Sequence, residues 1–122
     1  MRIILNHEKL SRLHEMVTLL LKQFPSENKA ELLLDAIVNK VRLRMRNRLD
    51  ALNSKNSYSV SLPIEEALAF YLWFEQIETC LTRTDYIFER TVATQIKNQI
   101  DQTYGTIKPA GAIDSSLQRT LS

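Results

Sequence analysis

The chain has 122 residues, of which 16 are Lys or Arg and 14 are Asp or Glu, and 44% of its residues are hydrophobic. This length fits one domain, and the composition is that of a folded protein rather than a disordered one. Both glycines, Gly105 and Gly111, lie among the last 18 residues. Residues 1–104 therefore cannot form a P-loop, a dinucleotide-binding turn or a nucleophile elbow, since each needs glycine where the backbone meets a phosphate or turns sharply.

The sequence also indicates a location in the cytoplasm and away from membranes. The longest apolar run, 67–74, is eight residues long and far shorter than a membrane span. The first residues turn polar after three apolar ones, so we expect no secretory signal there. Cys80 is the only cysteine and cannot form a disulfide within the chain, which is typical of a reducing compartment.

The first part of the chain predicts a short strand followed by a helix. Residues 2–5 are expected to be extended, and Asn6 is suited to cap the helix that follows. Over 7–24 the apolar residues recur at steps of three and four, which places them on one helix face. They are Leu10, Leu13, Val17, Leu20, Leu21 and Phe24. Pro25 ends this helix, because the residue before a proline is pushed out of the α region.

A second helix is predicted from 27 to about 52, with Ser26 as its cap. Acidic residues come early in it and basic residues late, an order that complements the helix dipole. Its apolar seam repeats at about eleven residues and consists of Ala30, Leu34, Ile37, Val41, Met45, Leu49 and Leu52. Val41, Leu43 and Met45 also alternate with basic residues at period two, which is a strand pattern. The helical pattern on both sides of this segment favours a helix.

A turn, a second strand and a third helix are predicted next. Residues 53–57 form a turn cluster, and 58–62 alternate apolar residues with serines, as in a short strand. We expect this strand to pair with 2–5 and to lie on the helices, because a two-stranded sheet alone is marginally stable. Pro63 suits the first turn of a helix over 63–80. Since its run 67–74 is apolar all round, this helix is expected to be the central one.

Residues 82–85 predict a helix break with a new cap, with one long bent helix over 64–104 as the alternative. The fourth helix carries apolar side chains at steps of four: Phe88, Val92, Ile96, Ile100 and Tyr104. Gly105 suits its end. Beyond it, Ile113, Leu117 and Leu121 recur at spacing four, which indicates a short amphipathic turn.

The predicted fold is therefore mainly α. Residues 1–104 form a compact four-helix core with a short two-stranded β-ribbon, and residues 105–122 form a C-terminal arm. The first two helices are expected to make an antiparallel hairpin around 24–26, with the helix at 63–80 filling the middle.

Basic residues are concentrated on the second helix. Residues 40–48 hold five basic side chains and no acidic one, while the rest of the chain has 11 basic and 14 acidic residues. At about 100° per residue, Arg44 and Arg48 flank one side of the apolar seam, and Arg42 and Arg46 flank the other. Such arginines either bind phosphates or cover the core and pair with carboxylates across a helix or subunit interface. The candidate partners are Glu65, Glu66, Glu75 and Glu78. Arginines on both sides of the seam favour a helix that lies between protein partners.

No metal, cofactor or catalytic site is predicted. His7 and His14 are two helical turns apart, about 10.5 Å, which is too far to bind one ion. Cys80 has no histidine nearby in sequence and is expected to be a small buried hydrophobe. Glu75 and Glu78 share a helix face, but without an E-x-x-H motif a solvated or Arg-paired face is favoured. Because no nucleophile is paired with a base, no enzyme and no small-molecule substrate is expected.

The aromatic residues of the third helix are expected to be core. Phe70, Tyr71, Trp73 and Phe74 have no Lys or Arg among them, and base stacking needs rings interleaved with basic residues. Tyr71 or Trp73 at the surface would suit a protein interface.

Residues 1–50 show a short strand, a helix, a turn with Ser26, and a second helix. This order resembles that of ribbon-helix-helix DNA-binding dimers. The resemblance implies a nucleic-acid-binding regulator; the strand offers one basic side chain, Arg2, and residues 58–104 lie outside the motif.

The sequence thus predicts a small non-enzymatic protein that works by association, with itself or as an accessory subunit of a larger assembly. The expected contact residues are Arg42, Arg44, Arg46 and Arg48 of the second helix and Ile113, Leu117 and Leu121 of the arm. The alternative is a nucleic-acid-binding accessory protein or regulator that uses the same arginines on phosphates. Salt distinguishes the two, because phosphate binding weakens steeply with salt and helix docking weakens little.

Overall fold

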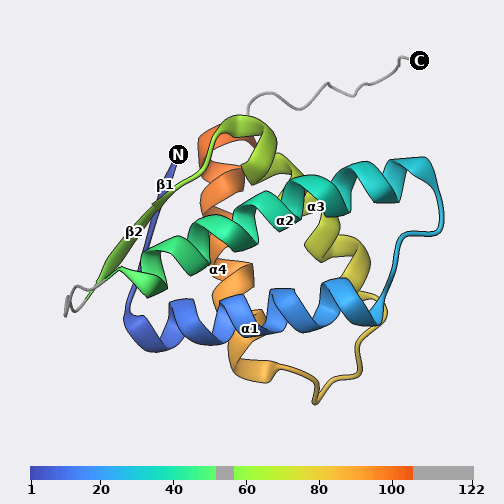
Figure 1. Ribbon diagram of the computed structural model, residues 1–122, viewed down its shortest axis with the longest axis horizontal. Coiled ribbons are helices and arrows are strands. Elements are labelled where there is room, and N and C mark those ends of the chain that lie inside the picture. Colours follow the sequence, from blue (N-terminus) through green and yellow to red (C-terminus); the bar gives the residue numbers. More distant parts are fainter. Residues whose placement is uncertain (52–56, 106–122) are drawn as a thin grey trace.

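The computed structural model describes residues 1–51 and 57–105 (Figure 1). Its elements are β1 (Arg2–Leu5), α1 (His7–Gln23), α2 (Lys29–Asp50), β2 (Tyr58–Ser61), α3 (Ile64–Glu78) and α4 (Ile87–Tyr104). The described chain is mainly helical with a short two-stranded sheet, which confirms the predicted fold class. The expected arm contacts Ile113, Leu117 and Leu121 and the seam residue Leu52 lie outside the described residues.

The four helices contact one another in the order α1, α2, α3, α4 and back to α1, so they form a ring and do not surround a central helix. α1 and α2 run antiparallel side by side, and α4 crosses behind them (Figure 1). α2 packs most extensively on α3 and next on α1, while α4 packs against both α1 and α3. The expected hairpin is present. The expectation that α3 is buried on several sides is wrong in part, because Ile64, Leu68 and Leu72 are exposed.

The two strands pair with each other as predicted. β1 is antiparallel to β2, with Arg2 opposite Ser61 and Leu5 opposite Tyr58. Each strand turns every second side chain inward, and the pleat of a strand makes this alternation. The side-chain amide of Gln99 in α4 donates a hydrogen bond to the carbonyl of Arg2 at 2.7 Å, which holds the sheet against the helices.

Two asparagines begin the first two helices. Asn6 caps α1 as predicted, its side-chain oxygen accepting from the N–H of Lys9 at 2.8 Å. α2 is capped by Asn28 rather than Ser26: the Asn28 side chain accepts from the N–H of Glu31 at 2.9 Å. The Ser26 hydroxyl instead donates to the carboxylate of Asp35, which ties the linker to the second turn of α2.

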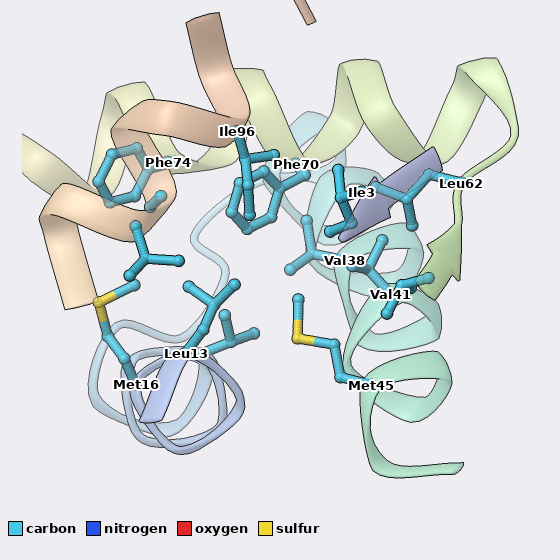
Figure 2. Packing of buried hydrophobic residues seen from close by; sticks show 14 of the residues in the cluster. Ile3, Leu13, Met16, Val38, Val41, Met45, Leu62, Phe70, Phe74 and Ile96 are labelled. Atoms are coloured by element: carbon cyan, nitrogen blue, oxygen red, sulfur yellow. The ribbon is translucent and has the colours of Figure 1, made fainter. Parts of the chain in front are cut away.

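The core is one hydrophobic cluster to which every element contributes. Figure 2 shows Ile3, Leu13, Met16, Val38, Val41, Met45, Leu62, Phe70, Phe74 and Ile96 converging on it. Two of them, Met16 and Val38, were absent from the predicted helix faces. Ala30 was predicted in the seam of α2 and is exposed, whereas the buried residues of this helix begin at Val38. The N-terminal third of α2 therefore lies largely outside the core.

The segment between α3 and α4 is a break, so the alternative of one helix over 64–104 is wrong. The N–H of Thr82 donates to the Asp85 carboxylate at 3.0 Å, and the Arg90 guanidinium donates to the Thr82 carbonyl at 2.7 Å. Tyr86 precedes α4 with φ of 52° in the left-handed region, which is costly for an aromatic residue. No side chain caps α4, contrary to the expected new cap.

The period-two pattern at 41–45 yields a direct test of the helical assignment. In α2 the side chains of Val41 and Met45 are buried while that of Leu43 is exposed, whereas a strand would place all three on one face. We expect Met45→Ala to lower the free energy of unfolding by about 2–5 kcal/mol and Leu43→Ala by less than about 0.5 kcal/mol. Denaturant unfolding of the two variants, at protein concentrations at which the chain is monomeric, measures both changes, and equal losses would contradict the helix.

Candidate interaction surface

α2 carries apolar residues on two faces. Its inner face holds the buried Val38, Val41 and Met45. On the other side, Leu32, Ala36 and Leu43 follow at spacings of four and seven and fall within about 40° of one another around the helix. Leu32 is 60% exposed and Leu43 is 43% exposed, and Leu33 beside them is also exposed. We call Leu32, Ala36 and Leu43 the outward stripe.

A stripe of charged residues, which we call the charged stripe, runs beside the outward stripe. Its first three members directly precede Leu32, Ala36 and Leu43 in the sequence. It consists of Glu31, Asp35, Arg42 and Arg46, so its acidic members precede its basic ones. This flank of α2 faces α1, because Arg42 and Arg46 act on the ring of His14 in α1. Nε of Arg42 donates to the side chain of Asn39 at 2.8 Å, and Nε of Arg46 lies 3.5 Å from the carboxylate of Asp50.

The opposite flank of α2 faces α3 and is held there by an ion pair. Arg44 binds Glu66 through two contacts, Nε to Oε1 at 2.6 Å and a terminal nitrogen to Oε2 at 3.0 Å. Glu66 is 5% exposed and is the one buried charged residue in the described chain. Its hydrogen bond raises the pKa of Arg44 above its ordinary value. A buried carboxylate is costly unless a cation pairs with it, so Arg44 is a structural residue.

The four predicted arginines therefore do not converge on one site. Arg44 points to α3 and Arg42 and Arg46 to α1, in agreement with the flanks predicted from helical periodicity. Arg48 is exposed and has no ion-pair partner among residues 1–51 and 57–105. Of the glutamates expected as partners, Glu66 pairs with one of these arginines, while Glu75 pairs with Lys97 and Glu78 with Arg90 of α4.

His14 lies at the contact between α1 and α2 in an environment that disfavours its charge. Its Nε2 is buried and makes no hydrogen bond within the described part of the chain. Burial first, and then the nearby guanidinium groups of Arg42 and Arg46, lower the pKa of His14 below its ordinary value. The carboxylates of Asp50 and Glu15 oppose this effect.

A second apolar surface lies between α3 and α4. A groove of about 270 Å³ is lined by Leu68, Tyr71, Leu72, Ile100, Asp101, Tyr104 and Gly105. The Tyr71 hydroxyl donates to the Asp101 carboxylate at 3.2 Å, and burial together with this contact raises the pKa of Tyr71. The lining is mainly apolar, and with Leu68 and Leu72 exposed the groove continues the open side of α3.

Cys80 differs from the expectation: it is exposed rather than buried, because it follows the end of α3 at the molecular surface. The rings of Phe70, Trp73 and Phe74 are core, as predicted, while Tyr71 is half-buried. The described residues contain no group of three or more His, Cys, Asp or Glu side chains arranged to hold a metal ion. No helix of the described chain has the length and apolar character needed to cross a membrane.

The outward stripe was not recognised in the sequence, although its signal is present there. Leu32, Ala36 and Leu43 satisfy a helical spacing, as the longer predicted seam does; the seam lies on the buried face, with Val41 and Met45 in the core, and the shorter set lies outside it. Comparison with protein-family models, with curated proteins and with solved structures finds no match for this chain.

Removal of Arg44 is expected to destabilise the fold. Arg44→Met leaves the Glu66 carboxylate buried without its cation, which should cost about 1–3 kcal/mol of the free energy of unfolding. The matched control is Arg46→Met, whose pair with Asp50 is exposed and should contribute less than about 0.5 kcal/mol. Adding Glu66→Met to Arg44→Met should recover most of the loss. Denaturant unfolding measures all three variants, and equal losses for Arg44→Met and Arg46→Met would contradict the structural role.

His14 should make the protein less stable at mildly acidic pH. Its pKa is lowered in the folded chain, so below its unfolded value of about 6.5 the unfolded state binds more protons. The free energy of unfolding therefore falls as the pH drops below about 6.5, by at most about 1.4 kcal/mol per pH unit from this group, until the folded pKa is passed. His14→Phe fills similar space without titrating and should flatten this dependence. Thermal unfolding of both proteins between pH 7.5 and 5.5 tests it, and identical slopes would refute the assignment.

Proposed function

We propose that this chain is a non-enzymatic association protein that docks a helix of another protein molecule on the outward stripe of α2. The observation that carries the proposal is the exposure of Leu32 and Leu43 on a well-formed helix whose opposite face already fills the core. Scattered exposed leucines need no explanation, but three apolar residues in register along three turns form a helix-binding surface.

The spacing of the outward stripe fits a helix as its partner. Residues 32, 36, 39 and 43 follow at steps of four, three and four, the pattern by which one helix packs against another in a coiled-coil seam. Asn39 is the polar member, and a polar residue in such a seam sets register at some cost in stability. The guanidinium groups of Arg42 and Arg46 lie at the rim, where ion pairs contribute more to specificity than to affinity.

Two features favour this function over the nucleic-acid alternative. Arg44 already binds a buried carboxylate of its own chain, and Arg44 lies on a different flank of α2 from Arg42 and Arg46. A phosphate-binding face needs free cations on one surface. In β1, which a ribbon-helix-helix protein would present to DNA, Arg2 is the only basic residue.

The other elements of the proposal rest on the sequence. A cytoplasmic location is proposed because the lone Cys80 suits a reducing compartment. Additional contacts by Ile113, Leu117 and Leu121 of the arm remain predictions. The groove between α3 and α4 opens beside Gly105, where the arm begins.

The proposal predicts protein crosslinks from the middle of the outward stripe. The full chain is expressed in cells with a photoreactive benzoylphenylalanine in place of Ala36. After irradiation it should form a crosslink to one protein, which can be identified by mass spectrometry and can be a second copy of the chain. Leu32→Gln combined with Leu43→Gln should abolish the crosslink while lowering the free energy of unfolding by less than about 1 kcal/mol, because both side chains are exposed. The matched control is Ile87→Gln, which changes an equally exposed apolar residue on α4 and should leave the crosslink intact.

Two results would contradict this function. The first is the absence of a protein crosslink at Ala36. The second is co-elution of the purified chain with a random-sequence DNA duplex at low salt only, lost on Arg42→Gln with Arg46→Gln, which would support the nucleic-acid alternative.

A further inference from the structure

The charged stripe of α2 is complementary to itself when read in the opposite direction. Along the helix its order is Glu31, Asp35, Arg42, Arg46, so two acidic residues are followed by two basic residues. Two such helices side by side and parallel would bring like charges together. Two antiparallel helices would bring the acidic half of each opposite the basic half of the other.

The outward stripe has the same symmetry. The midpoint between Leu32 and Leu43 is also the midpoint between Ala36 and Asn39. In an antiparallel pair with its two-fold axis at this midpoint, Leu32 therefore lies opposite Leu43 of the second copy, and Ala36 lies opposite its Asn39. The small Ala36 next to the axis lets the two helices approach closely, and helix pairs pack at about 8–10 Å depending on the side chains at the contact.

From these two symmetries we propose that the occupant of the outward stripe is a second copy of this chain, bound through an antiparallel, two-fold α2–α2 contact. This inference rests on the proposed function and names its partner. A two-fold interface uses the same patch on both subunits, so it needs a surface that complements itself, and α2 supplies one in both its apolar and its charged residues.

The members of the charged stripe are engaged within their own chain but keep groups for these contacts. Glu31 accepts a hydrogen bond from the N–H of Glu27 at one carboxylate oxygen, and Asp35 accepts one from the Ser26 hydroxyl at one oxygen, so each keeps its other oxygen for a guanidinium group of the second copy.

Arg46 and Asp50 form a pair in which both side chains are more than half exposed, and such surface pairs contribute little. Arg42 uses Nε on Asn39 and keeps its other guanidinium nitrogens for a carboxylate. Of the other basic side chains of α2, Arg44 binds Glu66, and Lys29, Lys40 and Arg48 are exposed on the flank opposite the charged stripe, where their long side chains reach solvent.

The first test is the association of the purified full chain, measured by sedimentation equilibrium. The wild-type chain should be a dimer. Arg42→Glu with Arg46→Glu makes the charged stripe wholly acidic, and Glu31→Lys with Asp35→Lys makes it wholly basic, so each variant alone should dimerise at least tenfold more weakly. A mixture of the two variants should form a heterodimer, which also shows that both variants are folded.

The matched control changes the opposite flank by the same charge. Lys29→Glu with Lys40→Glu alters two lysines of the same helix and should leave the dimer within about threefold of the wild-type dissociation constant. If the control weakens the dimer as much as Arg42→Glu with Arg46→Glu, the contact does not depend on the charged stripe and the inference is wrong.

The second test determines the direction of the helices, in a chain that also carries Cys80→Ser. Antiparallel packing places residue 32 of one copy opposite residue 43 of the other and separates the two copies of residue 32 by about 16 Å along the helices. A disulfide needs Cα atoms within about 7 Å. Mild oxidation should therefore crosslink a mixture of a Leu32→Cys chain and a Leu43→Cys chain, but neither chain alone. Crosslinking of each chain alone would show a parallel pair and overturn the inference.

The remaining outcomes separate this inference from the function on which it rests. A wild-type chain that is monomeric at all concentrations, or a dimer unaffected by the charge variants, overturns the α2–α2 dimer. If Ala36 of that same chain still crosslinks to a different protein, the association function stands and only the identity of the partner was wrong. If Ala36 gives no protein crosslink, both fail together.

Discussion

The packing of α2 between α1 and α3 is the constraint on which the rest of the structure depends. α2 contacts both α1 and α3, and its contact with α3 is the broadest between any two elements of the described fold. Within it Glu66 is buried as a carboxylate, and Arg44 is the cation that makes this burial tolerable. The pair and the buried side chains of Val38, Val41 and Met45 belong to one rotation of α2 about its own axis, and this rotation decides which residues of α2 face the core and which face solvent.

The rotation of α2 has a functional consequence. With Val38, Val41 and Met45 directed inward, Leu32, Ala36 and Leu43 necessarily face outward, because the two sets lie on opposite sides of the helix. Leu32 lies in the N-terminal third of α2, which is largely outside the core, and Leu43 lies further along the helix on the side opposite the core. This placement is what the proposed association with a second α2 would use. The proposed function thus depends on a surface that folding creates rather than on any single reactive group.

The arginines of the basic cluster at 40–48 have different roles in the fold. Arg44 stabilises the α2–α3 contact, Arg42 and Arg46 disfavour the charged form of His14, and Arg48 extends to solvent. The high local positive charge, for which the sequence favours pairing with protein carboxylates and leaves phosphate binding as the alternative, is divided in the fold between two flanks of a helix. Carboxylates of the same chain lie against two of the four side chains. What the cluster would provide to the proposed partner is therefore a charged rim beside an apolar centre.

The sequence by itself determined the local features of this protein. The strands at 2–5 and 58–61, the cap at Asn6, the break between α3 and α4, and the two flanks of the arginines all follow from turn chemistry and periodicity, which act over a few neighbouring residues. Only the tertiary structure decided that Leu32, Ala36 and Leu43 stay uncovered, that Asn28 rather than Ser26 begins that helix, and that one side of α3 is open. These outcomes depend on contacts between residues far apart in the chain, such as Arg44 with Glu66. Periodicity places Val41 and Met45 on the buried face of α2, but how far along this helix its neighbours reach, and therefore that Ala30 is exposed, depends on the packing of α1 and α3.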